Sequence, residues 1–472
     1  MLLGVSERLS ENIMTGLRGS KSGIFQPQCV LNNPTTGFNL ELPYINYFVI
    51  EQKFDQTYMD MFGLGIDVRP RELRKLIESQ QDLECTLILT PLNEFDYIEL
   101  YNQEKIVFNL KVLVDDQTDL SKKYPEGLFQ NNDTTGEIRD EDVNEYTTSE
   151  QFSAKVSIDL HLVEPEAYRL RHIQFNSMFT EATMEAIIHW VGMQISAAEV
   201  NVAPPDNTQS YKNCVIPPMH SFATIFPFLQ ERYGVYSKGI GYYFTDKKMY
   251  VYPLYETSSD KSVADGIMHL LNAPEKYFLG MSRYHSEVDQ DIYVVSVSPK
   301  ELKVTATEGV ENVGNVQMST NADGTLDSFV QADGQGGIVR NSNDITSVSM
   351  QNTAVNMTNN TQNVKYNGET TNLYNSTSKM AAVDGVLIAA GWLRAYPRLI
   401  KPGQPVIYHY DAPKADYRTQ SGRVLAVKYV GRNNPSMGPE HCIIFDASII
   451  AKLEADLRSS SDTQSLANFK LW

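Results

Sequence analysis

The chain contains 472 residues, of which 42% are hydrophobic, and this length exceeds what one hydrophobic core usually organises, so we expect two to four domains. Its 58 acidic and 40 basic residues give a formal net charge of -18, and a surface with that charge repels the backbone of nucleic acids. This negative charge disfavours specific binding to DNA or RNA, and it suits a surface along which nucleic acid passes without binding.

The sequence also lacks the patterns of a targeting segment or a membrane span. Charged residues interrupt the first twenty positions, which is not typical of a signal peptide, and no run of about 18 apolar residues occurs. The cysteines are few and distant from one another, which favours folding in a reducing cytosol over a disulfide framework. They are Cys29, Cys85, Cys214 and Cys442.

No catalytic, cofactor or metal motif emerges from the residues. There is no Cys-X-X-Cys, His-Glu-X-X-His or Gly-X-Ser-X-Gly pattern and no Walker lysine. Gly63–Asp67 lacks the third glycine of a dinucleotide-binding motif, and we interpret it as an ordinary loop. Glu164 and Glu166 fit a solvated strand end better than a glycosidase pair. We therefore expect no enzyme activity, no cofactor and no metal site.

Residues 1–37 are predicted as an N-terminal arm and residues 38–200 as a first β-barrel domain. Pro70 opens a short helix over residues 71–80, and a second helix is expected from its cap Thr180 to Ser196, with His189 packed on it. The buried face of the second helix is predicted as Met184, Ile187, Ile188, Val191 and Ile195. Alternating apolar residues predict strands over residues 40–52, 85–90, 106–114 and 152–163.

Two polar segments stand apart from this pattern. Residues 115–150 hold eleven acidic residues against three basic ones, and we interpret them as an exposed acidic loop. Residues 306–379 are rich in Asn, Thr, Ser, Gln, Gly and Asp, so they cannot bury much apolar surface by themselves. They are predicted as a polar insertion that is either disordered or ordered against a partner.

Residues 201–305 are predicted as an α+β domain that begins at Ile216, after a polar linker over residues 201–213. Its first element is a helix with Gly234 as a suitable C-terminal cap, and Pro227 is expected to kink this helix or restart it. Strands are predicted over residues 242–244, 249–252 and 291–297, the first two joined as an aromatic hairpin.

Residues 380–458 are predicted as a second β-barrel domain and residues 459–472 as a tail. Pro402 and Gly403 set a tight turn, because proline fixes φ and glycine accepts a positive φ. An alternating strand follows this turn, and Gly422 is expected to open the next strand. The last elements are predicted as a closing strand over Ile443–Phe445 and a helix over Ala447–Arg458.

The chain resembles the central baseplate hub protein of contractile-tail bacteriophages, which is related to the hub part of type VI secretion spikes. The resemblance lies in the order and the residue pattern of the helix, the aromatic hairpin and the C-terminal turn with its strands. The residues that carry the resemblance are Phe222–Tyr236, Gly241–Phe244, Met249–Pro253 and Leu399–Val430. The resemblance implies two hub-type β-barrels in each subunit, here within residues 38–165 and 385–446, joined by smaller α+β domains.

The function implied by this resemblance is structural. Three subunits would form a ring with pseudo-sixfold symmetry, which joins the sixfold tail tube to the threefold spike and surrounds the DNA channel. The implied partners are further copies of the chain, the tail tube protein, the central spike, the baseplate wedge proteins and the tape measure protein. The expected location is the tail baseplate of the virion, after folding in the host cytoplasm.

Aromatic residues are candidates for the subunit contacts, because tyrosine and tryptophan are enriched in interface cores. The predicted interface residues are Tyr242, Tyr243, Phe244, Pro402, Gly403 and Trp472, and residues 447–472 are expected to contact a component such as the spike. The 26 tyrosines also suit half-buried strands. Two alternative functions stay open: a receptor- or glycan-binding tail protein with residues 306–379 as its tip, and a tail-associated cell-wall hydrolase.

Overall fold

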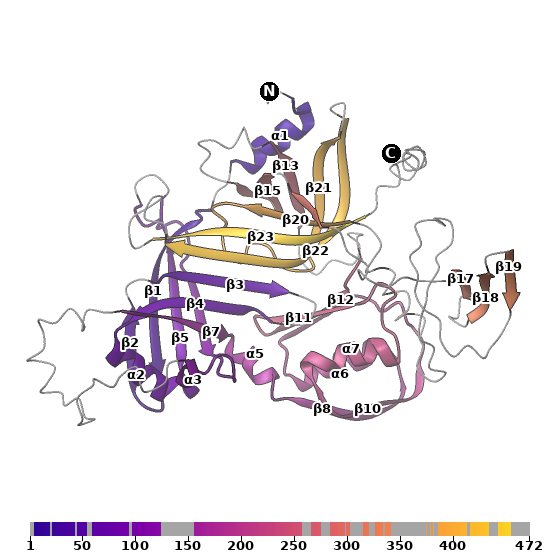
Figure 1. Ribbon diagram of the computed structural model, residues 1–472, viewed down its shortest axis with the longest axis horizontal. Coiled ribbons are helices and arrows are strands. Elements are labelled where there is room, and N and C mark those ends of the chain that lie inside the picture. The colour runs from indigo at the N-terminus through magenta and orange to yellow at the C-terminus, as the bar shows by residue number, and fades with distance from the viewer. Residues whose placement is uncertain are drawn as a thin grey trace, which may run out of the picture.

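The computed structural model describes residues 4–18, 21–42, 45–53, 59–93, 97–123, 155–256, 266–274, 284–297, 299–302, 315–320, 326–333, 336–340, 386–412, 416–433 and 442–454, with residues 374, 378 and 381 (Figure 1). Most of the predicted acidic loop, most of residues 306–379 and the tail with Trp472 lie outside the described residues. Over the described ranges, no helix combines the length and the apolar character needed to cross a membrane.

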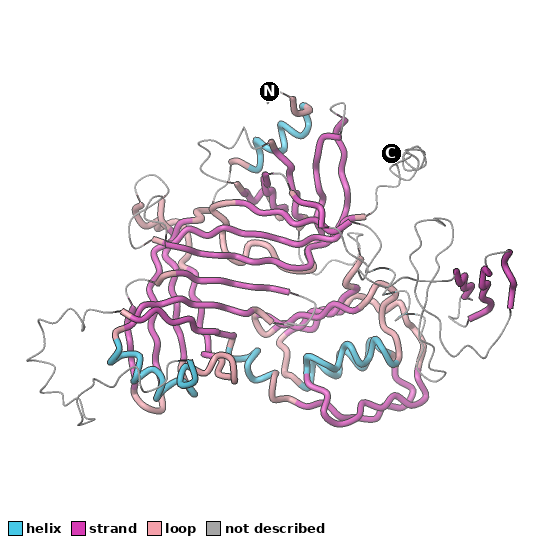
Figure 2. Tube along the Cα trace, viewed as in Figure 1, coloured by secondary structure: helices cyan, strands magenta, loops and turns pink. Residues whose placement is uncertain are grey.

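Most of the described chain is β-strand, and few helices interrupt it (Figure 2), so the mainly β fold class with α+β parts is confirmed. The largest sheet contains fifteen strands. They are β1 (Ile24–Asn33), β2 (Phe38–Leu42), β3 (Tyr47–Lys53), β4 (Met61–Val68), β5 (Glu84–Pro91), β6 (Ile106–Val112), β7 (Val156–Val163), β13 (Met268–Ala273), β14 (His285–Val288), β15 (Asp291–Val297), β16 (Lys300–Leu302), β20 (Val386–Trp392), β21 (Pro405–Ala412), β22 (Asp416–Asn433) and β23 (Ile443–Leu453).

Strands β22 and β23 pair with each other and belong to two groups of strands at once. In the first group, the pairing path runs from β22 through β3, β4, β7, β6, β5 and β1 to β23, and so returns to β22. In the second group, β22 pairs with β21, β21 with β13, and β13 with β15, while β20 pairs with β23. The Ser296 hydroxyl links β15 to β20, because it donates to the carbonyl oxygen of Gly391 at 2.8 Å. Residues 38–200 and 380–458 thus contribute to one sheet, and their boundaries as domains stay a prediction.

The length of β22 lets it serve both groups. Its first half pairs with β21 and its second half with β3, and the register shifts between Val424 and Ala426. A bulge of this kind bends a strand and increases its twist. The prediction that Gly422 opens this strand is wrong, since the strand begins at Asp416. A Cβ atom at Gly422 would lie 2.1 Å from the carbonyl oxygen of Lys452, so this glycine permits the close approach of β23.

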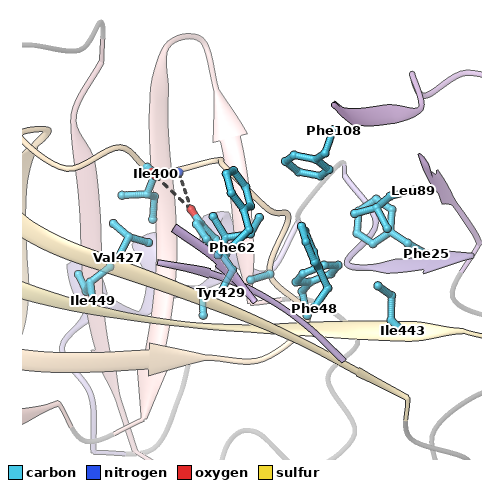
Figure 3. Close-up of a cluster of buried hydrophobic side chains, with 14 of the residues drawn as sticks. Phe25, Phe48, Phe62, Leu89, Phe108, Ile400, Val427, Tyr429, Ile443 and Ile449 are labelled. Atoms are coloured by element: carbon cyan, nitrogen blue, oxygen red, sulfur yellow. Dashed lines mark hydrogen bonds between the residues drawn. The ribbon is translucent and has the colours of Figure 1, made fainter. Parts of the chain in front are cut away.

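The core inside the first group combines aliphatic side chains with a cluster of aromatic ones (Figure 3). Phe48 stacks on Phe62 with ring centres 5.9 Å apart, and Phe445 meets Phe25 edge-on at 5.6 Å. All four rings are at most 1% exposed. Each buried ring contributes on the order of 2 kcal/mol to stability through the hydrophobic effect. Residue alternation along β3 buries Phe48 and leaves the neighbouring residues of that strand more exposed.

Six helices appear in the described residues: α1 (Glu7–Gly16), α2 (Pro70–Ser79), α3 (Leu120–Lys123), α5 (Pro165–Leu170), α6 (Met184–Gln194) and α7 (Phe222–Arg232), with a 3-10 turn η1 (Gln80–Asp82) after α2. The helix predicted after Pro70 is confirmed as α2, with the proline at its first position. The predicted N-terminal arm contains α1 and β1, and β1 pairs with β2, β5 and β23.

A smaller unit lies beside the main sheet and contains α6 and α7 between two layers of strands (Figure 1). One layer is the two-stranded ribbon of β8 (Gln174–Ala182) and β10 (Tyr211–Ser221). The other is formed by β9 (Glu199–Val202), β11 (Ile240–Thr245) and β12 (Lys248–Pro253). We call these elements, with α5, the helical unit. A separate three-stranded sheet, β17 (Asn315–Thr320), β18 (Leu326–Asp333) and β19 (Gly336–Arg340), lies in the predicted polar insertion.

Several local predictions for the helical unit are confirmed. The buried face of α6 is as predicted, and α7 ends before Gly234, which has φ 76° and donates its N–H to the carbonyl oxygen of Leu229. The aromatic hairpin is β11 and β12. Its loop is only Asp246 and Lys247, both with a positive φ, which is the backbone that a two-residue hairpin loop requires.

Other predictions for this unit are wrong. Thr180 lies in β8, and Thr183 caps α6 instead, since its side chain accepts a hydrogen bond from the N–H of Ala186. Ile216 does not open a domain but lies inside β10. His189 is exposed on α6 rather than packed. At Thr180 and Ile216, strand pairing between β8 and β10 replaced a boundary that local residue types suggested.

Two further predictions fail in the main sheet. Residues 447–453 are not helical, because the alternation of buried Ala447, Ile449 and Ala451 with exposed Ser448 and Ile450 has the period of a strand, and β23 pairs with β20 and β22 there. The segment Gly63–Asp67 is not a loop but the centre of β4.

Candidate functional site at the charged junction

Three carboxylates surround the guanidinium of Arg398, in the segment after β20. Its Nη2 donates to Oδ2 of Asp60 at 2.7 Å and to the carboxylate of Glu164, and Nη1 lies 3.7 Å from Oδ1 of Asp246. Asp60 precedes β4, Glu164 follows β7, and Asp246 lies in the loop between β11 and β12. One cation therefore joins the main sheet to the helical unit, and we call these four residues the Arg398 cluster.

Burial decides the electrostatics of this cluster. The Asp60 side chain is fully buried, and burial raises the pKa of its carboxyl even though the charge of Arg398 opposes the shift. Burial likewise raises the pKa of Glu164. Burial by itself would lower the pKa of Arg398, but the charges of Asp60 and Glu164 outweigh it and raise that pKa. The guanidinium stays charged, and three carboxylates share its single positive charge.

Polar and aromatic groups complete the surroundings of the cluster. The Nε2 atom of Gln52 donates to Asp60 at 3.0 Å and to the hydroxyl of Tyr243 at 3.1 Å. The guanidinium carbon lies 5.8 Å from the ring centre of Phe62 and 5.4 Å from that of Phe108. Hydrogen bonds and cation–π contacts therefore offset part of the cost of burying these charges.

Two buried cations also meet the helical unit at the end of β12. Arg423 is fully buried; it donates to the carbonyl oxygen of Pro253 at 3.5 Å and lies 5.6 Å from the ring centre of Tyr252. Burial lowers the pKa of Arg423. Lys452 is 2% exposed, and its Nζ lies 5.3 Å from the ring centre of Tyr255. Together with the Arg398 cluster, these contacts form what we call the charged junction.

The structure places the predicted interface residues of the hairpin inside the chain. Tyr242, Tyr243 and Phe244 are at most 3% exposed, so their side chains serve the core of this protomer. The Tyr242 hydroxyl donates to the carbonyl oxygen of Ala223 at 2.6 Å. That carbonyl lies four residues before Pro227, whose ring nitrogen has no hydrogen to offer it. The tyrosine thus completes the hydrogen bonding of α7, which continues through the proline.

Pro402 and Gly403 are also buried, while Trp472 lies outside the described residues. Gly403 has φ 79°, as predicted for the turn, and a Cβ atom there would lie 2.9 Å from the ring of Tyr252. The turn therefore packs against the charged junction. A role for any of these residues in contacts between subunits stays a prediction.

The described residues bring together no group of three His, Cys, Asp or Glu side chains that could hold a metal ion. The predicted solvated strand end is wrong for Glu164, which is partly buried and paired with Arg398, whereas Glu166 pairs with Arg169 at 3.0 Å. Cys29 and Cys85 lie on neighbouring strands with their sulfur atoms 3.7 Å apart, and the four cysteines are free and buried.

One apolar surface of the helical unit is exposed. Met178 and Val215 lie opposite each other in the β8–β10 ribbon, and they are 68% and 47% exposed. Met219, in the same ribbon, is 81% exposed and has φ 81°. Contiguous exposed apolar side chains, such as the cross-strand neighbours Met178 and Val215, are the kind that mark interaction sites. We call these three residues the ribbon surface.

Sequence analysis missed the Arg398 cluster, because its members are up to 338 residues apart and each is an ordinary charged residue. The one local signal is Glu164 directly after an alternating strand, and this pattern also fits a solvated strand end. A cluster of this kind depends on strand pairing, which no local spacing encodes.

Residues 42–380 match the sequence family described as Bacteriophage PBS1 gene 109 protein. No curated protein matches the sequence. Similar solved structures include a tail protein from Neisseria meningitidis MC58 (9% identity, TM-score 0.40, covering 90% of this chain and 96% of that one) and the 43 kDa tail protein of prophage MuSo2 from Shewanella oneidensis (9%, 0.43, 93% and 100%). Another is the E. coli c3393 protein, described as a component of the type VI secretion system (8%, 0.36, 90% and 77%). At these identities and TM-scores, the comparisons show no more than a loose likeness of fold.

Proposed function

The chain belongs to the Bacteriophage PBS1 gene 109 protein family, and from this premise we propose that it is the central hub of a phage tail baseplate. In this role three copies form a ring that joins the sixfold tail tube to the threefold spike and surrounds the DNA channel. Its partners are further copies of itself, the tail tube protein, the spike, the wedge proteins and the tape measure protein. The role is structural and non-enzymatic, and its place is the baseplate of a contractile tail in the virion.

The observation that carries this proposal is the pair of strand groups that share β22 and β23. A ring of three subunits meets a sixfold tube only if each subunit presents two similar surfaces. The first group returns to its starting strand, and the second is linked from β15 to β20 through Ser296, so each group supports a barrel-like body. Two such bodies in each of three subunits supply six positions around an axis.

The charge of the chain supports the same role. A formal net charge of -18 gives a surface that repels the phosphate backbone, as a channel for passing DNA requires. The cations of the charged junction fix the helical unit to the main sheet. Arg398 contacts Asp246 of the helical unit and carboxylates beside β4 and β7, while Arg423 of β22 and Lys452 of β23 lie against Tyr252 and Tyr255. A rigid subunit of this kind transmits force between tube and spike.

The ribbon surface is our proposed contact between subunits. Met178, Val215 and Met219 offer apolar area on an outer layer of the helical unit, and burying such area drives association.

Native mass tests the proposal. We expect the purified chain at micromolar concentration to have a mass near three times 53.2 kDa by light scattering, and particle images to show a ring with pseudo-sixfold symmetry. The variant Met178→Ser/Val215→Ser is expected to shift the mass towards one subunit. The matched control is Ile98→Ser/Val107→Ser, which removes exposed apolar side chains from β6 and from the segment before it and leaves the ribbon surface intact.

The outcomes separate the parts of the proposal. A monomer in both solution and images, with no ring when the purified tail tube protein is added, would contradict the hub. A ring that persists in the ribbon variant would contradict the ribbon surface alone. An equal loss of mass in the ribbon variant and its control would also speak against this surface.

A further inference from the structure

Gly63, on the outward face of β4, is a strand glycine that the packing of the chain does not require. A Cβ atom at Gly63 would come no closer than 3.7 Å to a neighbouring atom, and its φ is not positive. At Gly65, by contrast, a Cβ atom would lie 2.3 Å from the ring of Tyr47, and the other strand glycines with described surroundings have a neighbour within 3.3 Å of that position. A glycine weakens a strand, and it often marks a place where a ligand or another chain approaches closely.

The surroundings of Gly63 form a notch in the sheet face. Among the described residues, only two atoms lie within 4 Å of its Cβ position, Cβ of Val49 at 3.7 Å and Cε2 of Tyr47 at 4.0 Å. Gly63 lies opposite Val49 of β3 and His161 of β7, and these two strands are about 10 Å apart across β4. The Tyr47 ring is held in place, because its hydroxyl donates to Oδ1 of Asp159 at 2.7 Å. We call the space between Val49, Tyr47 and His161 the Gly63 notch.

Met219 shows the opposite feature, a long side chain that projects from strained backbone. It lies in β10, in the ribbon that forms the outer layer of the helical unit (Figure 1). Between Ile216 and His220 the register shifts, and three residues of β10 face one residue of β8. Within this bulge Met219 has φ 81° and is 81% exposed. A positive φ is unfavourable for a side chain of this size, and strain of this kind gathers at functional sites.

The symmetry of a ring of three copies connects the two features. In a cyclic trimer each contact joins two different surfaces, so each copy has to present a projecting surface and a surface that receives it. The ribbon surface, with Met219, is the projecting one. Its counterpart has to accept an apolar side chain, and the Gly63 notch is a place on the same chain that does so. This step rests on the proposed hub role, which does not itself say what the ribbon surface contacts.

Charge favours the same pairing of surfaces. Copies with a formal net charge of -18 repel one another, so they associate best through surfaces without excess charge. At the notch, Asp159 pairs with Lys123 at 3.6 Å, and Glu51 lies between Lys53 and Lys428. The outward residues beside the ribbon surface are uncharged: Asn176, Thr180 and Asn213. Neither surface therefore opposes the contact.

We propose that Met219 of one copy inserts into the Gly63 notch of the next copy, and that three such contacts close the ring. The sulfur atom then lies against the ring of Tyr47, which is a favourable contact for a thioether. Methionine suits this position because its flexible side chain adapts to an irregular space. Gly63 is a glycine because the side chain that fills this space belongs to another copy.

Cross-linking of the full-length protein tests the contact. We expect the variant Gly63→Cys/Met219→Cys, treated with a short bis-maleimide, to give linked species of two and three chains in at least ten times the yield of Gly63→Cys/Met193→Cys. Met193 is the matched control, because it is an exposed methionine of α6 outside the ribbon surface. The native cysteines are buried and should react little. A mixture of Gly63→Cys and Met219→Cys proteins should give a two-chain product, which shows that the link joins different copies.

Filling the notch tests the same contact without a cross-linker. Gly63→Leu places a side chain where Met219 inserts, so we expect trimer association to weaken at least tenfold by light scattering over a range of concentrations. Met219→Ala should also weaken association in the unchanged background. In the Gly63→Leu background it should change association less than twofold, because the contact is already lost. Thr86→Leu, on the outward face of β5, adds the same side chain elsewhere and should leave the mass unchanged.

The outcomes separate this contact from the hub role. A ring of three in which residues 63 and 219 link no better than the control pair, or a Gly63→Leu protein that keeps its trimer, overturns the contact and leaves the hub role intact. A link found only within one chain overturns it as well. The absence of both a ring and a link in the unchanged and cysteine-bearing proteins contradicts the contact and the hub role together. If Gly63→Leu fails to fold, the cross-linking result decides, because cysteine is a small replacement for glycine at an uncrowded position.

Discussion

At Arg398, a single guanidinium balances the fully buried Asp60, the partly buried Glu164 and the exposed Asp246. Placing a charge in the protein interior costs several kcal/mol unless a partner of opposite charge is close. Asp60 is fully buried, and its partner is one cation that it shares with Glu164 and Asp246. This shortage of positive charge is why burial raises the pKa of both Asp60 and Glu164 despite their contacts with Arg398.

We predict that Arg398→Met lowers the free energy of unfolding by about 3 kcal/mol, because it leaves Asp60 buried without its counter-ion. The measurement is the urea midpoint of the first unfolding transition, followed by fluorescence. Arg74→Met removes an exposed pair with Glu78 on α2 and should change stability by less than about 0.5 kcal/mol. A loss in Arg398→Met no larger than in this control would refute the importance of the cluster.

The companion variant Asp60→Asn removes the charge of this side chain and keeps its size and shape. Since burial raises the pKa of Asp60, the folded state binds its proton more tightly than the unfolded state does, and the stability linked to this group is lost as the pH rises through the folded-state pKa. Asp60→Asn removes that loss, so it should cost less than Arg398→Met at neutral pH. A larger cost would mean that the ionised carboxylate, rather than its burial, dominates the cluster.

Among the elements, α7 and β11 depend on each other through one carbonyl group. Pro227 removes a hydrogen bond from the interior of α7, and the hydroxyl of Tyr242 in β11 supplies the missing donor to Ala223. The tyrosine is 3% exposed, so water does not compete for this position. A helix that contains proline is thus specified by a residue of the neighbouring strand.

We expect Tyr242→Phe to lower the melting temperature, with a loss of about 1–2 kcal/mol, because the carbonyl of Ala223 is left without a donor in a buried place. In the background of Pro227→Ala the same change should cost clearly less, since the new backbone N–H serves that carbonyl. A double-mutant cycle measured by thermal unfolding checks this coupling. Equal costs in the two backgrounds would show that the hydroxyl does not replace the helix hydrogen bond.

For the whole molecule, the sharing of β22 and β23 makes the two strand groups one cooperative unit. Loss of either strand removes pairing partners from β3 and β1 on one side and from β21 and β20 on the other. The helical unit is attached differently, through the charged junction and through a second core that also includes Val163 of β7.

Phe445→Ala tests this cooperativity. The ring is fully buried against Phe25 and Phe48 in the first group, so its loss should cost about 3–5 kcal/mol. Native-state hydrogen exchange should show that loss equally in β3 of the first group and in β13 of the second. Ser448→Ala, on the exposed face of the same strand, is the control and should change neither. A loss confined to β3 would show that the two groups unfold independently.

The sequence by itself determined the mainly β class, α2, the buried face of α6, the hairpin of β11 and β12, and the resemblance to a tail hub. These features follow from local rules, because a proline, a glycine or an apolar period acts on residues within a few positions of it. Local rules failed where long-range pairing took precedence: at residues 447–453, which join β23, and at Thr180, which joins β8. Only the tertiary structure decided that β22 and β23 serve two strand groups and that Arg398 collects carboxylates from distant segments. Each of these needs residues more than a hundred positions apart in the chain, and their proximity is a property of sheet register that no local pattern records.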